Sequence, residues 1–541
     1  MPMLPSAPPS APGTLAPAHA ASLSAWAPLG SPVFRMLWGT WMAANICMWM
    51  NDVAAAWLMT SLTTSQIMVA LVQSASTLPV FLLGLPSGAL ADILDRRRYF
   101  IITQFWVAAV ALLLCATILS GAMTPPLLLA LIFANGVGLA MRWPVFAAIV
   151  PELLPRAQLP AALALNGVAM NASRIIGPLV AGAIIASAGS AYVFVLNAVL
   201  SLILGFVIMR WRRQHVPSPL GRERLVSAMR VGVQFVRQSA RLRAVMLRVA
   251  LFFFHSTALL ALLPLVARGL QGGGAGTFTL LLASMGAGAI FVAFLLPRLR
   301  LALSRDALVL GGMLLQSMAT VVLALAPNVY VASPAMVLAG AGWITTANIL
   351  SVSAQMALPD WVRARGMSIF QMAIMGASAS GAAVWGQVAT LTSVPASMLM
   401  AALTGTVSIL ATHWLFRDRS IEEDLTPSRA FTVPRAAAPP LTGQVRVAIQ
   451  YQIDPARAAD FRALMQESRR SRLRQGARAW ELLRDISDPG RYIEQITDES
   501  WTEHLRRFDR VTAGDVALRD RKLAFHLGET PPVITRCVLE A

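Results

Sequence analysis

Apolar runs of about 20 residues recur along the first three quarters of the chain, and short polar segments separate them. Each run is long enough to cross a hydrocarbon core ~30 Å thick as a helix, so each run predicts a transmembrane helix. Six runs precede a long charged segment and six follow it. In chain order they extend over residues 34–59, 67–91, 99–121, 125–148, 161–187, 191–211, 245–267, 276–296, 306–326, 329–354, 366–389 and 395–416.

The overall composition agrees with a membrane protein. Of the 541 residues, 56% are hydrophobic and 13% are charged, whereas a soluble protein carries about 25% charged residues. Cys47, Cys115 and Cys537 stand far apart and show neither metal-ligand nor disulfide spacing. We therefore expect no metal and no cofactor.

The distribution of arginine predicts the orientation. With the N-terminus inside, the outer loops together contain Arg268 as their one basic residue, and the inner loops hold the others. By the positive-inside rule both termini are then cytoplasmic, in a multi-pass protein of a bacterial inner membrane. Residues 443–541 contain 17 basic and 15 acidic residues, so most of the net charge of +18 falls on the inner loops. The charge therefore indicates contact with the lipid bilayer and not with nucleic acid.

The two sets of six runs resemble each other. Pro151-Glu152 follows the fourth run as Pro359-Asp360 follows the tenth, and each pair leads into a Gly/Ala-rich helix. Such duplication is typical of alternating access, with a small-molecule substrate bound between the halves. The predicted fold is an all-α membrane protein of twelve transmembrane helices in two six-helix pseudo-repeats, followed by a small α+β domain. The expected divisions are a disordered tail (1–33), a first bundle (34–211), a cytoplasmic loop with an amphipathic helix (212–244), a second bundle (245–416), a linker (417–442) and the α+β domain (443–541).

The predicted loop after the second helix carries a recognisable motif. Gly88, Asp92, Arg96 and Arg97 match the loop signature of major facilitators, which this segment resembles, while Ile93 and Asp95 depart from it. The resemblance implies a gating contact with the eleventh helix that holds the outward-open state. The alternative is a charged turn that only sets orientation.

A second motif lies in the fifth helix. Gly177, Pro178 and Gly182 are similar to the antiporter signature of drug:proton exporters, and Ser173 and Ala181 depart from it. The resemblance implies export in exchange for protons. The alternative is an ordinary transmembrane helix whose small residues permit close packing.

Two charged residues fall well inside the predicted membrane segments. Arg174 lies near the middle of the fifth helix, where a charge normally faces a cavity or a partner. Asp52 is the one acid well inside the segments, and proton coupling and a hydrated outer gate are equally good interpretations of it. Because the first and fifth helices are neighbours in the family, we expect an Asp52–Arg174 pair, direct or through water.

Other polar residues in the predicted helices are weaker candidates. His255 can titrate near neutral pH, although a neutral histidine with a hydrogen-bonding neighbour is the favoured interpretation. Arg142 and Arg248 lie near the inner interface and are expected to snorkel toward water. The expected cavity takes an amphipathic molecule, because it offers more apolar surface than fixed charge. Its candidate lining residues are Asn45, Asn51, Asn135, Asn171, Asn348, Gln371 and Trp385.

The last hundred residues change character. Its pattern predicts a β-α-β-β-α-β, ferredoxin-like order. Alternation predicts a strand at 445–453, and further strands are expected at 478–486, 491–497 and 532–539. Helices are expected after Asp454, after Ser500 and at 514–527. This tail resembles antibiotic-biosynthesis-monooxygenase-type domains, through Trp480, Glu494 and His504 among others. Homodimerisation through 443–541, or ligand sensing, is favoured over catalysis, because no metal or flavin motif is present.

The whole chain, tail included, resembles the transmembrane secretion effector group of major facilitators, which is related to the enterobactin exporter. The resemblance implies proton-driven export of a drug, a siderophore or a similar small molecule. Two alternatives stay open: import of a lipid-like or polar nutrient, and a transporter whose tail is an active monooxygenase-like enzyme.

Overall fold

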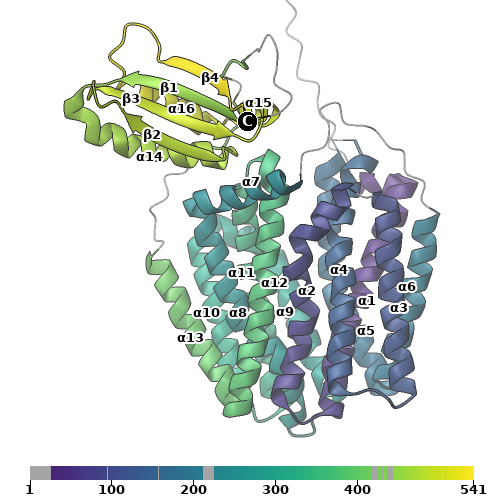
Figure 1. The fold of residues 1–541 in the computed structure, drawn as a ribbon. Coiled ribbons are helices and arrows are strands. Elements are labelled where there is room, and N and C mark those ends of the chain that lie inside the picture. Colours follow the sequence, from purple (N-terminus) through teal and green to yellow (C-terminus); the bar gives the residue numbers. More distant parts are fainter. Residues whose placement is uncertain are drawn as a thin grey trace, which may run out of the picture.

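The computed structural model describes residues 26–93, 95–155, 158–210, 225–415, 424–428, 430–434 and 443–540. It consists of a long helical bundle and a small sheet domain, residues 443–540, which we call the tail domain; it lies at one end of the bundle (Figure 1). We call this end of the bundle the tail end and the opposite one the far end. Most of the predicted disordered segment 1–33 lies outside the described residues, and Ala27–Gly30 forms the short helix η1.

Twelve long helices of the described chain form the bundle, six before and six after a short helix. Eleven of them are long and apolar enough to cross a membrane, and the twelfth, α1, carries Asn45, Asn51 and Asp52 in its sequence. The predicted fold class is therefore confirmed. The first half contains α1 (Pro32–Leu62), α2 (Gln66–Ile93), α3 (Arg96–Leu119), α4 (Pro125–Leu153), α5 (Leu159–Ser187) and α6 (Ser190–Met209). The second half contains α8 (Ala240–Gly269), α9 (Ala275–Ala302), α10 (Arg305–Ala324), α11 (Val329–Met356), α12 (Asp360–Leu391) and α13 (Val394–Leu415).

The two halves meet mainly through two helix pairs, α2 with α12 and α5 with α9. Small residues allow the backbones to approach, which is how helices associate where lipid replaces water. Ser74 of α2 donates a hydrogen bond of 2.6 Å to the carbonyl oxygen of Ala379 in α12. A Cβ atom at Gly84 would lie 3.0 Å from the Met372 side chain, so this pair is tightly packed.

An aromatic contact joins the halves at the far end. Trp57, near the end of α1, stacks on Phe278, near the start of α9, with 5.7 Å between ring centroids. The guanidinium of Arg268, at the end of α8, lies 5.0 Å from the Trp57 ring. A cation and two aromatic rings therefore cover the junction of the halves at this end.

A short helix, α7 (Leu225–Gln238), links the bundle to the tail domain. Its Val231 and Phe235 are buried, and Phe235 packs edge-on against Trp361 at the start of α12, with 5.8 Å between centroids. The sequence predicts an amphipathic helix under the lipid headgroups in this segment. In the structure, protein covers these apolar residues of α7.

The tail domain is a four-stranded antiparallel sheet with the strand order β2-β3-β1-β4. Its elements are β1 (Val445–Gln452), α14 (Ala458–Arg474), β2 (Ala479–Arg484), β3 (Arg491–Asp498), α15 (Trp501–Asp509), α16 (Ala513–Leu523) and β4 (Val533–Val538), with η3 (Pro455–Arg457) before α14. Val445, Val447 and Ile449 alternate with more exposed residues along β1 and pack with Phe461 and Met465 of α14. This connection and strand order confirm the expected ferredoxin-like arrangement.

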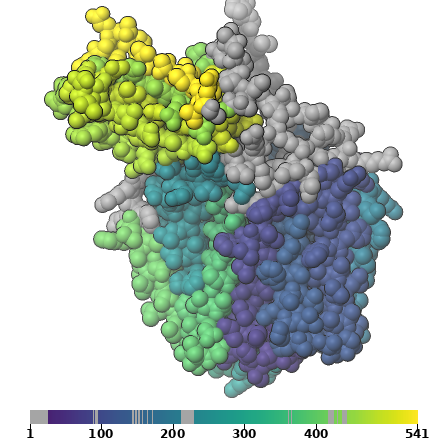
Figure 2. Space-filling model, viewed as in Figure 1, coloured from purple at the N-terminus to yellow at the C-terminus, as the bar shows by residue number. Residues whose placement is uncertain are grey.

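The tail domain sits on α7 (Figure 2) and also contacts the start of α12. Arg230 of α7 forms an ion pair of 2.9 Å with Glu499. Gly476, which has a φ of +109°, ends α14 in a turn that packs on Val231. The guanidinium of Arg510 lies 5.0 Å from the Trp361 ring. The tail domain is therefore docked on the helix pair α7 and α12.

Candidate functional site

The central feature of the bundle is a cation between two tryptophans. Arg174 is the sixteenth of the 29 residues of α5. Its guanidinium carbon lies 4.0 Å from the centre of the Trp343 ring and 5.2 Å from that of Trp49. Trp49 belongs to α1 in the first half and Trp343 to α11 in the second. Arg174 therefore joins the two halves near the middle of their helices, where the sequence predicted a cavity or a partner for its charge.

The Arg174 guanidinium keeps part of its hydrogen-bonding capacity unused. Its Nε atom is buried and has no hydrogen-bond acceptor among the described residues. Faces of aromatic rings attract a cation but accept no strong hydrogen bonds, so they leave guanidinium donors available. An oxygen atom of a bound molecule could accept from them.

The small residues of the helix 5 motif explain why α5 sits so close to its neighbours. A Cβ atom at Gly177 would lie 2.5 Å from the Cβ of Trp49, so glycine is needed where α5 crosses α1. At Gly182 a Cβ atom would collide with Thr279 of α9, in the other half. Pro178 is buried between them. The motif thus packs α5 against both halves, on either side of its proline.

Asp52 lies one turn beyond Trp49 on α1, and residues three apart share a helix face. Its carboxylate accepts a hydrogen bond of 2.9 Å from Ser76 of α2. Among the described residues no ion pair joins Asp52 to Arg174, so the expected direct pair is not formed in this conformation. The two are connected through α1, because Arg174 contacts Trp49 and Asp52 follows three residues later.

Asn51 and Arg142 belong to polar contacts inside the first half. Asn51 accepts a hydrogen bond of 3.3 Å from Asn197 of α6. Arg142 is 3% exposed, and it donates to Gln104 of α3 at 3.4 Å and faces the ring of Trp41 at 5.5 Å. The expectation that Arg142 snorkels toward water was wrong, because neighbouring polar and aromatic side chains accommodate its charge inside the bundle.

His255 lies away from the junction of the halves. Thr404 and Ser408 of α13 stand 3.3 and 3.4 Å from its two ring nitrogens. This agrees with the favoured interpretation of a histidine with hydrogen-bonding neighbours. Trp385 is buried beside it and donates to the carbonyl oxygen of Phe254 at 3.1 Å.

The remaining cavity candidates occupy varied surroundings. Asn45 is fully buried and donates to the Trp41 carbonyl of its own helix at 2.8 Å. Asn135 is buried in α4, and Gln371 is half-buried in α12. Asn348 is exposed and accepts from Arg300. The Asn171 side chain lies outside the described part of the structure, and a cavity role stays a prediction for all of these residues.

The loop motif between α2 and α3 is described in part. Gly88 and Asp92 belong to the end of α2, while Arg96 and Arg97 open α3; the side chains of Asp92 and Arg96 lie outside the described residues, so the gating contact stays a prediction. Arg97 donates to the carbonyl oxygen of Met209 at the end of α6, at 2.6 Å. Asp95, which departs from the family signature, is the N-cap of α3 and accepts from the Arg98 amide at 2.8 Å.

Three members of the central cluster were missed in the sequence: Trp49, Trp343 and Ser76. Trp343 and Ser76 lie in apolar runs without a charged neighbour, and Trp49 is an apolar residue one turn before Asp52, so periodicity treats all three as ordinary helix surface or core. A large aromatic residue near the middle of a span was the available signal, because Trp prefers the membrane interface and not the midplane.

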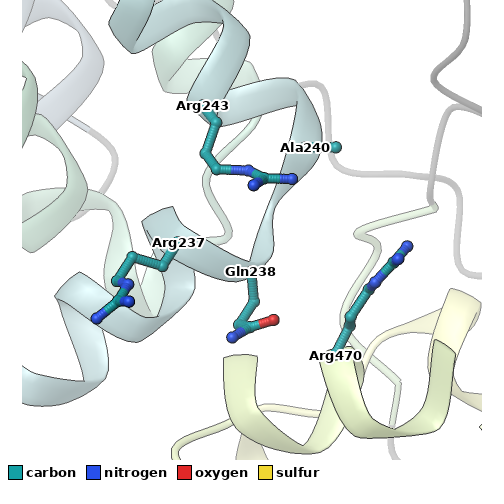
Figure 3. Close-up of a pocket in the computed structure, with 5 residues that line it drawn as sticks. All are labelled: Arg237, Gln238, Ala240, Arg243 and Arg470. Atoms are coloured by element: carbon teal, nitrogen blue, oxygen red, sulfur yellow. The ribbon is translucent and has the colours of Figure 1, made fainter. Parts of the chain in front are cut away.

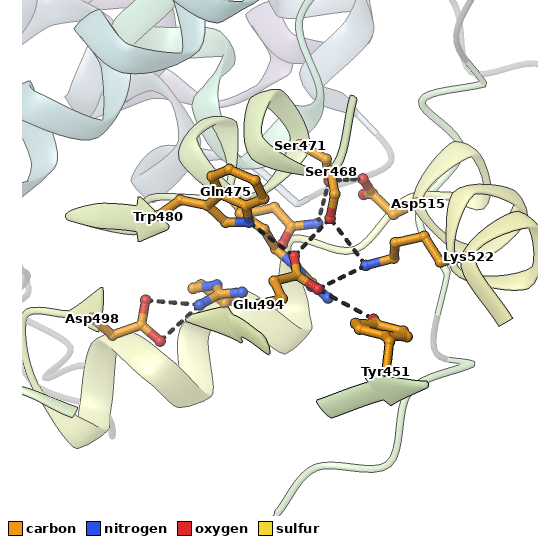
Figure 4. Close-up of polar contacts among 11 residues, drawn as sticks. Tyr451, Ser468, Ser471, Gln475, Trp480, Glu494, Asp498, Asp515 and Lys522 are labelled. Atoms are coloured by element: carbon orange, nitrogen blue, oxygen red, sulfur yellow. Dashed lines mark hydrogen bonds and ion pairs between the residues drawn. The ribbon is translucent and has the colours of Figure 1, made fainter. Parts of the chain in front are cut away.

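The tail domain contains a buried polar cluster of its own (Figure 4). Glu494 of β3 is fully buried. Burial alone would raise the pKa of its carboxyl, but Lys522 and Arg472 hold it well below its usual range. Burial lowers the pKa of Lys522 to about 8, and Glu494 opposes this shift. The groups around Glu494 are Ser468 at 2.7 Å, Trp480 at 3.0 Å, Lys522 at 3.1 Å, Tyr451 at 3.2 Å and Arg472 at 3.6 Å.

A second buried acid supports the start of α15. Asp498 accepts from Arg507 at 2.8 and 2.9 Å and lies 2.8 Å from Nδ1 of His504. Burial would raise the pKa of Asp498, but Arg507 and His504 lower it. Both acids are thus held by internal partners. Among the described residues no group of three or more His, Cys, Asp or Glu side chains could hold a metal ion.

Known proteins resemble this chain in part of its sequence and in its fold. Macrolide efflux protein A of Streptococcus pyogenes is 26% identical over 243 residues, which are 43% of this chain and 58% of that protein. The staphyloferrin A transporter of Staphylococcus aureus is 28% identical over 141 residues, 26% of this chain and 35% of that protein. This chain therefore spans less than two thirds of the length of either curated relative.

Solved structures of transporters match the bundle. A bacterial homologue of the human lysosomal transporter Spinster has a TM-score of 0.57 at 13% identity, covering 72% of this chain and 97% of that one. A mutant of the nucleoside transporter NupG has a TM-score of 0.56 at 13% identity, covering 71% of this chain and 100% of that one. At such identity the likeness shows the fold alone.

The family is shown by a match over nearly the whole chain. Residues 23–541 match the family described as transmembrane secretion effector. Membership of this family agrees with the interpretation as a membrane transporter and not an enzyme. The chain is a multi-pass membrane protein and belongs to the transmembrane secretion effector family of major facilitators.

Proposed function

We propose that this chain is a proton-coupled exporter of an amphipathic small molecule and works by alternating access. The observation that carries the proposal is Arg174, held between Trp49 of one half and Trp343 of the other. Relatives named for macrolide efflux and staphyloferrin A transport support export of a drug or siderophore. The partial antiporter motif on α5 also supports export from the cell.

Arg174 and its two tryptophan rings form a surface at the junction of the halves that is partly charged and partly apolar. An amphipathic molecule would place its apolar part on the tryptophans and an oxygen on the free guanidinium donors. When the halves rock, the distance between Arg174 and Trp343 must change, because they belong to different halves. Binding at this position is therefore coupled to the conformational change.

We place the tail domain, and both termini, on the cytoplasmic side of a bacterial inner membrane, because loop arginines gather at that end. The contacts that join α5 to the second half, at Arg174 and Gly182, begin at its middle and continue toward the far end. The Trp57–Phe278 stack covers the far end itself. These contacts close the far end of the bundle.

Proton coupling is assigned to Asp52. A carboxylate accepts a hydrogen bond from Ser76, whereas the protonated acid also carries a donor. Proton binding would therefore change the link between α1 and α2, and α2 packs along α12 of the second half. Asp52 also follows Trp49 by one turn, so a movement of α1 at Asp52 would change the contact between Trp49 and Arg174. These contacts give a route from protonation to the junction of the halves.

The test is proton exchange in everted vesicles that contain the full chain. A panel of drugs and siderophores is added while quenching of a pH-sensitive dye reports the proton gradient. We expect a substrate to dissipate the gradient with wild type but not with Asp52→Asn. Asp306→Asn is the matched control, because Asp306 is a half-exposed acid paired with Arg248. Coupled exchange at the wild-type level in Asp52→Asn would remove Asp52 from the mechanism, and uptake without proton movement would exclude proton coupling.

A further inference from the structure

A basic pocket lies where the tail domain meets the bundle. It has a volume of about 380 Å³ and is lined by Arg237 and Gln238 of α7, Ala240 and Arg243 of α8, and Arg470 of α14. Figure 3 shows Gln238 and Arg243 at the corner between α7 and α8, with Arg470 on the neighbouring helix of the tail domain. The pocket is therefore shared between the transporter and its tail domain.

The charges of this pocket are not balanced from within. None of the five lining residues is acidic, and Arg237, Arg243 and Arg470 are exposed. No ion pair of these three arginines is found in the described part of the chain. Glu467, one turn before Arg470 on α14, is held by Arg521 at 2.8 Å. The pocket thus concentrates positive charge at a contact between two parts of the protein.

Like charges on opposite sides of a contact oppose docking unless an anion lies between them. The rest of this contact is attractive, since Arg230 pairs with Glu499 and Val231 is buried against Gly476. The start of α8, a helix of 30 residues, also borders the pocket at Ala240. The N-terminal end of a helix favours negative charge, which adds to the effect of the arginines.

We propose that this pocket binds a phosphate-bearing anion that fastens the tail domain to the transporter. Guanidinium groups bind phosphate oxygens through paired, charge-assisted hydrogen bonds, and Arg243 and Arg470 would bind the same group from opposite sides. Because α7 lies across the tail end of the bundle, the phosphate could belong to a lipid headgroup or to a soluble molecule. The proposal concerns docking of the tail domain and does not depend on the transported substrate.

The test uses the full chain and two sources of phosphate. Inorganic pyrophosphate is titrated calorimetrically into protein in detergent, and native mass spectrometry counts phosphatidylglycerol against phosphatidylcholine retained from mixed nanodiscs. The variant is Arg243→Gln combined with Arg470→Gln. The matched control is Arg469→Gln, since Arg469 is exposed on the same helix but does not line the pocket.

Two results would support the proposal. Pyrophosphate that binds wild type and the control, and binds the double variant at least tenfold more weakly, assigns a soluble ligand. Phosphatidylglycerol enrichment that disappears only in the double variant assigns a lipid headgroup. In either case hydrogen exchange of residues 470–480 should rise in the double variant as docking weakens. If neither ligand distinguishes the double variant from wild type, the pocket is not a phosphate site.

Discussion

The guanidinium carbon of Arg174 in α5 lies 4.0 Å from the centre of the Trp343 ring in α11. The two residues belong to different halves of the bundle, so this contact depends on how the halves are arranged. A cation that rests on an aromatic face in a desolvated position gains about 2 kcal/mol. Such a contact is strong enough to bias a conformational equilibrium and weak enough to break in each transport cycle.

Replacement of Arg174 should impair transport according to the shape of the new side chain. Arg174→Gln removes the cation and should lower substrate efflux roughly 5- to 30-fold, the equivalent of 1–2 kcal/mol. Efflux by Arg174→Lys should fall between that of wild type and that of Arg174→Gln, because an ammonium keeps the charge but lacks the planar face that stacks on tryptophan. Efflux from loaded cells measures both. Arg210→Gln, an exposed position at the end of α6, should behave as wild type, and normal efflux by Arg174→Gln would refute the role.

Adding one methyl group at Gly182 should obstruct closure of the far end. Gly182→Ala forces its Cβ against Thr279 of α9, and overpacking of this kind costs about 1–3 kcal/mol. We expect slower transport and a lower melting temperature of the purified protein. A second substitution in the same chain, Thr279→Ala, should restore part of the transport rate and part of the melting temperature. Gly276→Ala serves as control, since no atom lies within 4 Å of a Cβ there; equal effects at both glycines would contradict the close-packing argument.

The buried acid of the tail domain should be essential for its stability. Glu494→Gln leaves the buried Lys522 and the half-buried Arg472 without their carboxylate, and breaking a buried ion pair in this way costs about 3–5 kcal/mol. Hydrogen exchange of peptides from residues 443–540 in the full chain should then accelerate. Glu481→Gln, at an exposed position on β2, should leave exchange unchanged. Unaltered protection in Glu494→Gln would mean that the cluster contributes little.

Acid should loosen the tail domain. The pKa values of Glu494, Asp498 and Asp515 lie below their ordinary values, because basic or hydrogen-bonding partners outweigh the effect of burial. The unfolded chain then binds more protons than the folded one as the pH falls, so this stabilisation is complete above the ordinary glutamate value of 4.5 and is lost below it. Pulsed hydrogen exchange after equilibration between about pH 6 and about pH 3 should show this loss in tail peptides. Protection that stays constant over this range would contradict the assignment.

Native cysteines offer a test of orientation. Cys537 is exposed in the tail domain, while Cys47 and Cys115 are buried. With the tail domain cytoplasmic, a membrane-impermeant maleimide should label Cys537 in everted vesicles but not in sealed cells. In a Cys537→Ser background, Thr392→Cys at the far end should show the reverse, since Thr392 is exposed between α12 and α13. Labelling of Cys537 in sealed cells would invert the proposed topology.

The sequence by itself determined the elements of this protein. Apolar runs predict the membrane helices because each residue partitions between lipid and water largely on its own. Alternation along β1 predicts a strand because successive side chains of a strand point to opposite faces. The caps are local as well: Ser500 accepts a hydrogen bond from the Glu503 amide at the start of α15, as the sequence predicts. Even the central position of Arg174 on its helix follows from counting residues.

Only the tertiary structure decided which side chains meet. Arg174 contacts Trp343 and forms no direct ion pair with Asp52 among the described residues, because helix rotation and the packing of Gly177 on Trp49 set the direction in which α5 faces. Asp52 accepts a hydrogen bond from Ser76, and protein covers Val231 and Phe235 of α7. These contacts join residues far apart in the chain, and their geometry depends on the packing of all twelve helices together. No local pattern contains that information, since partition between lipid and water acts on each segment and packing acts on pairs of segments.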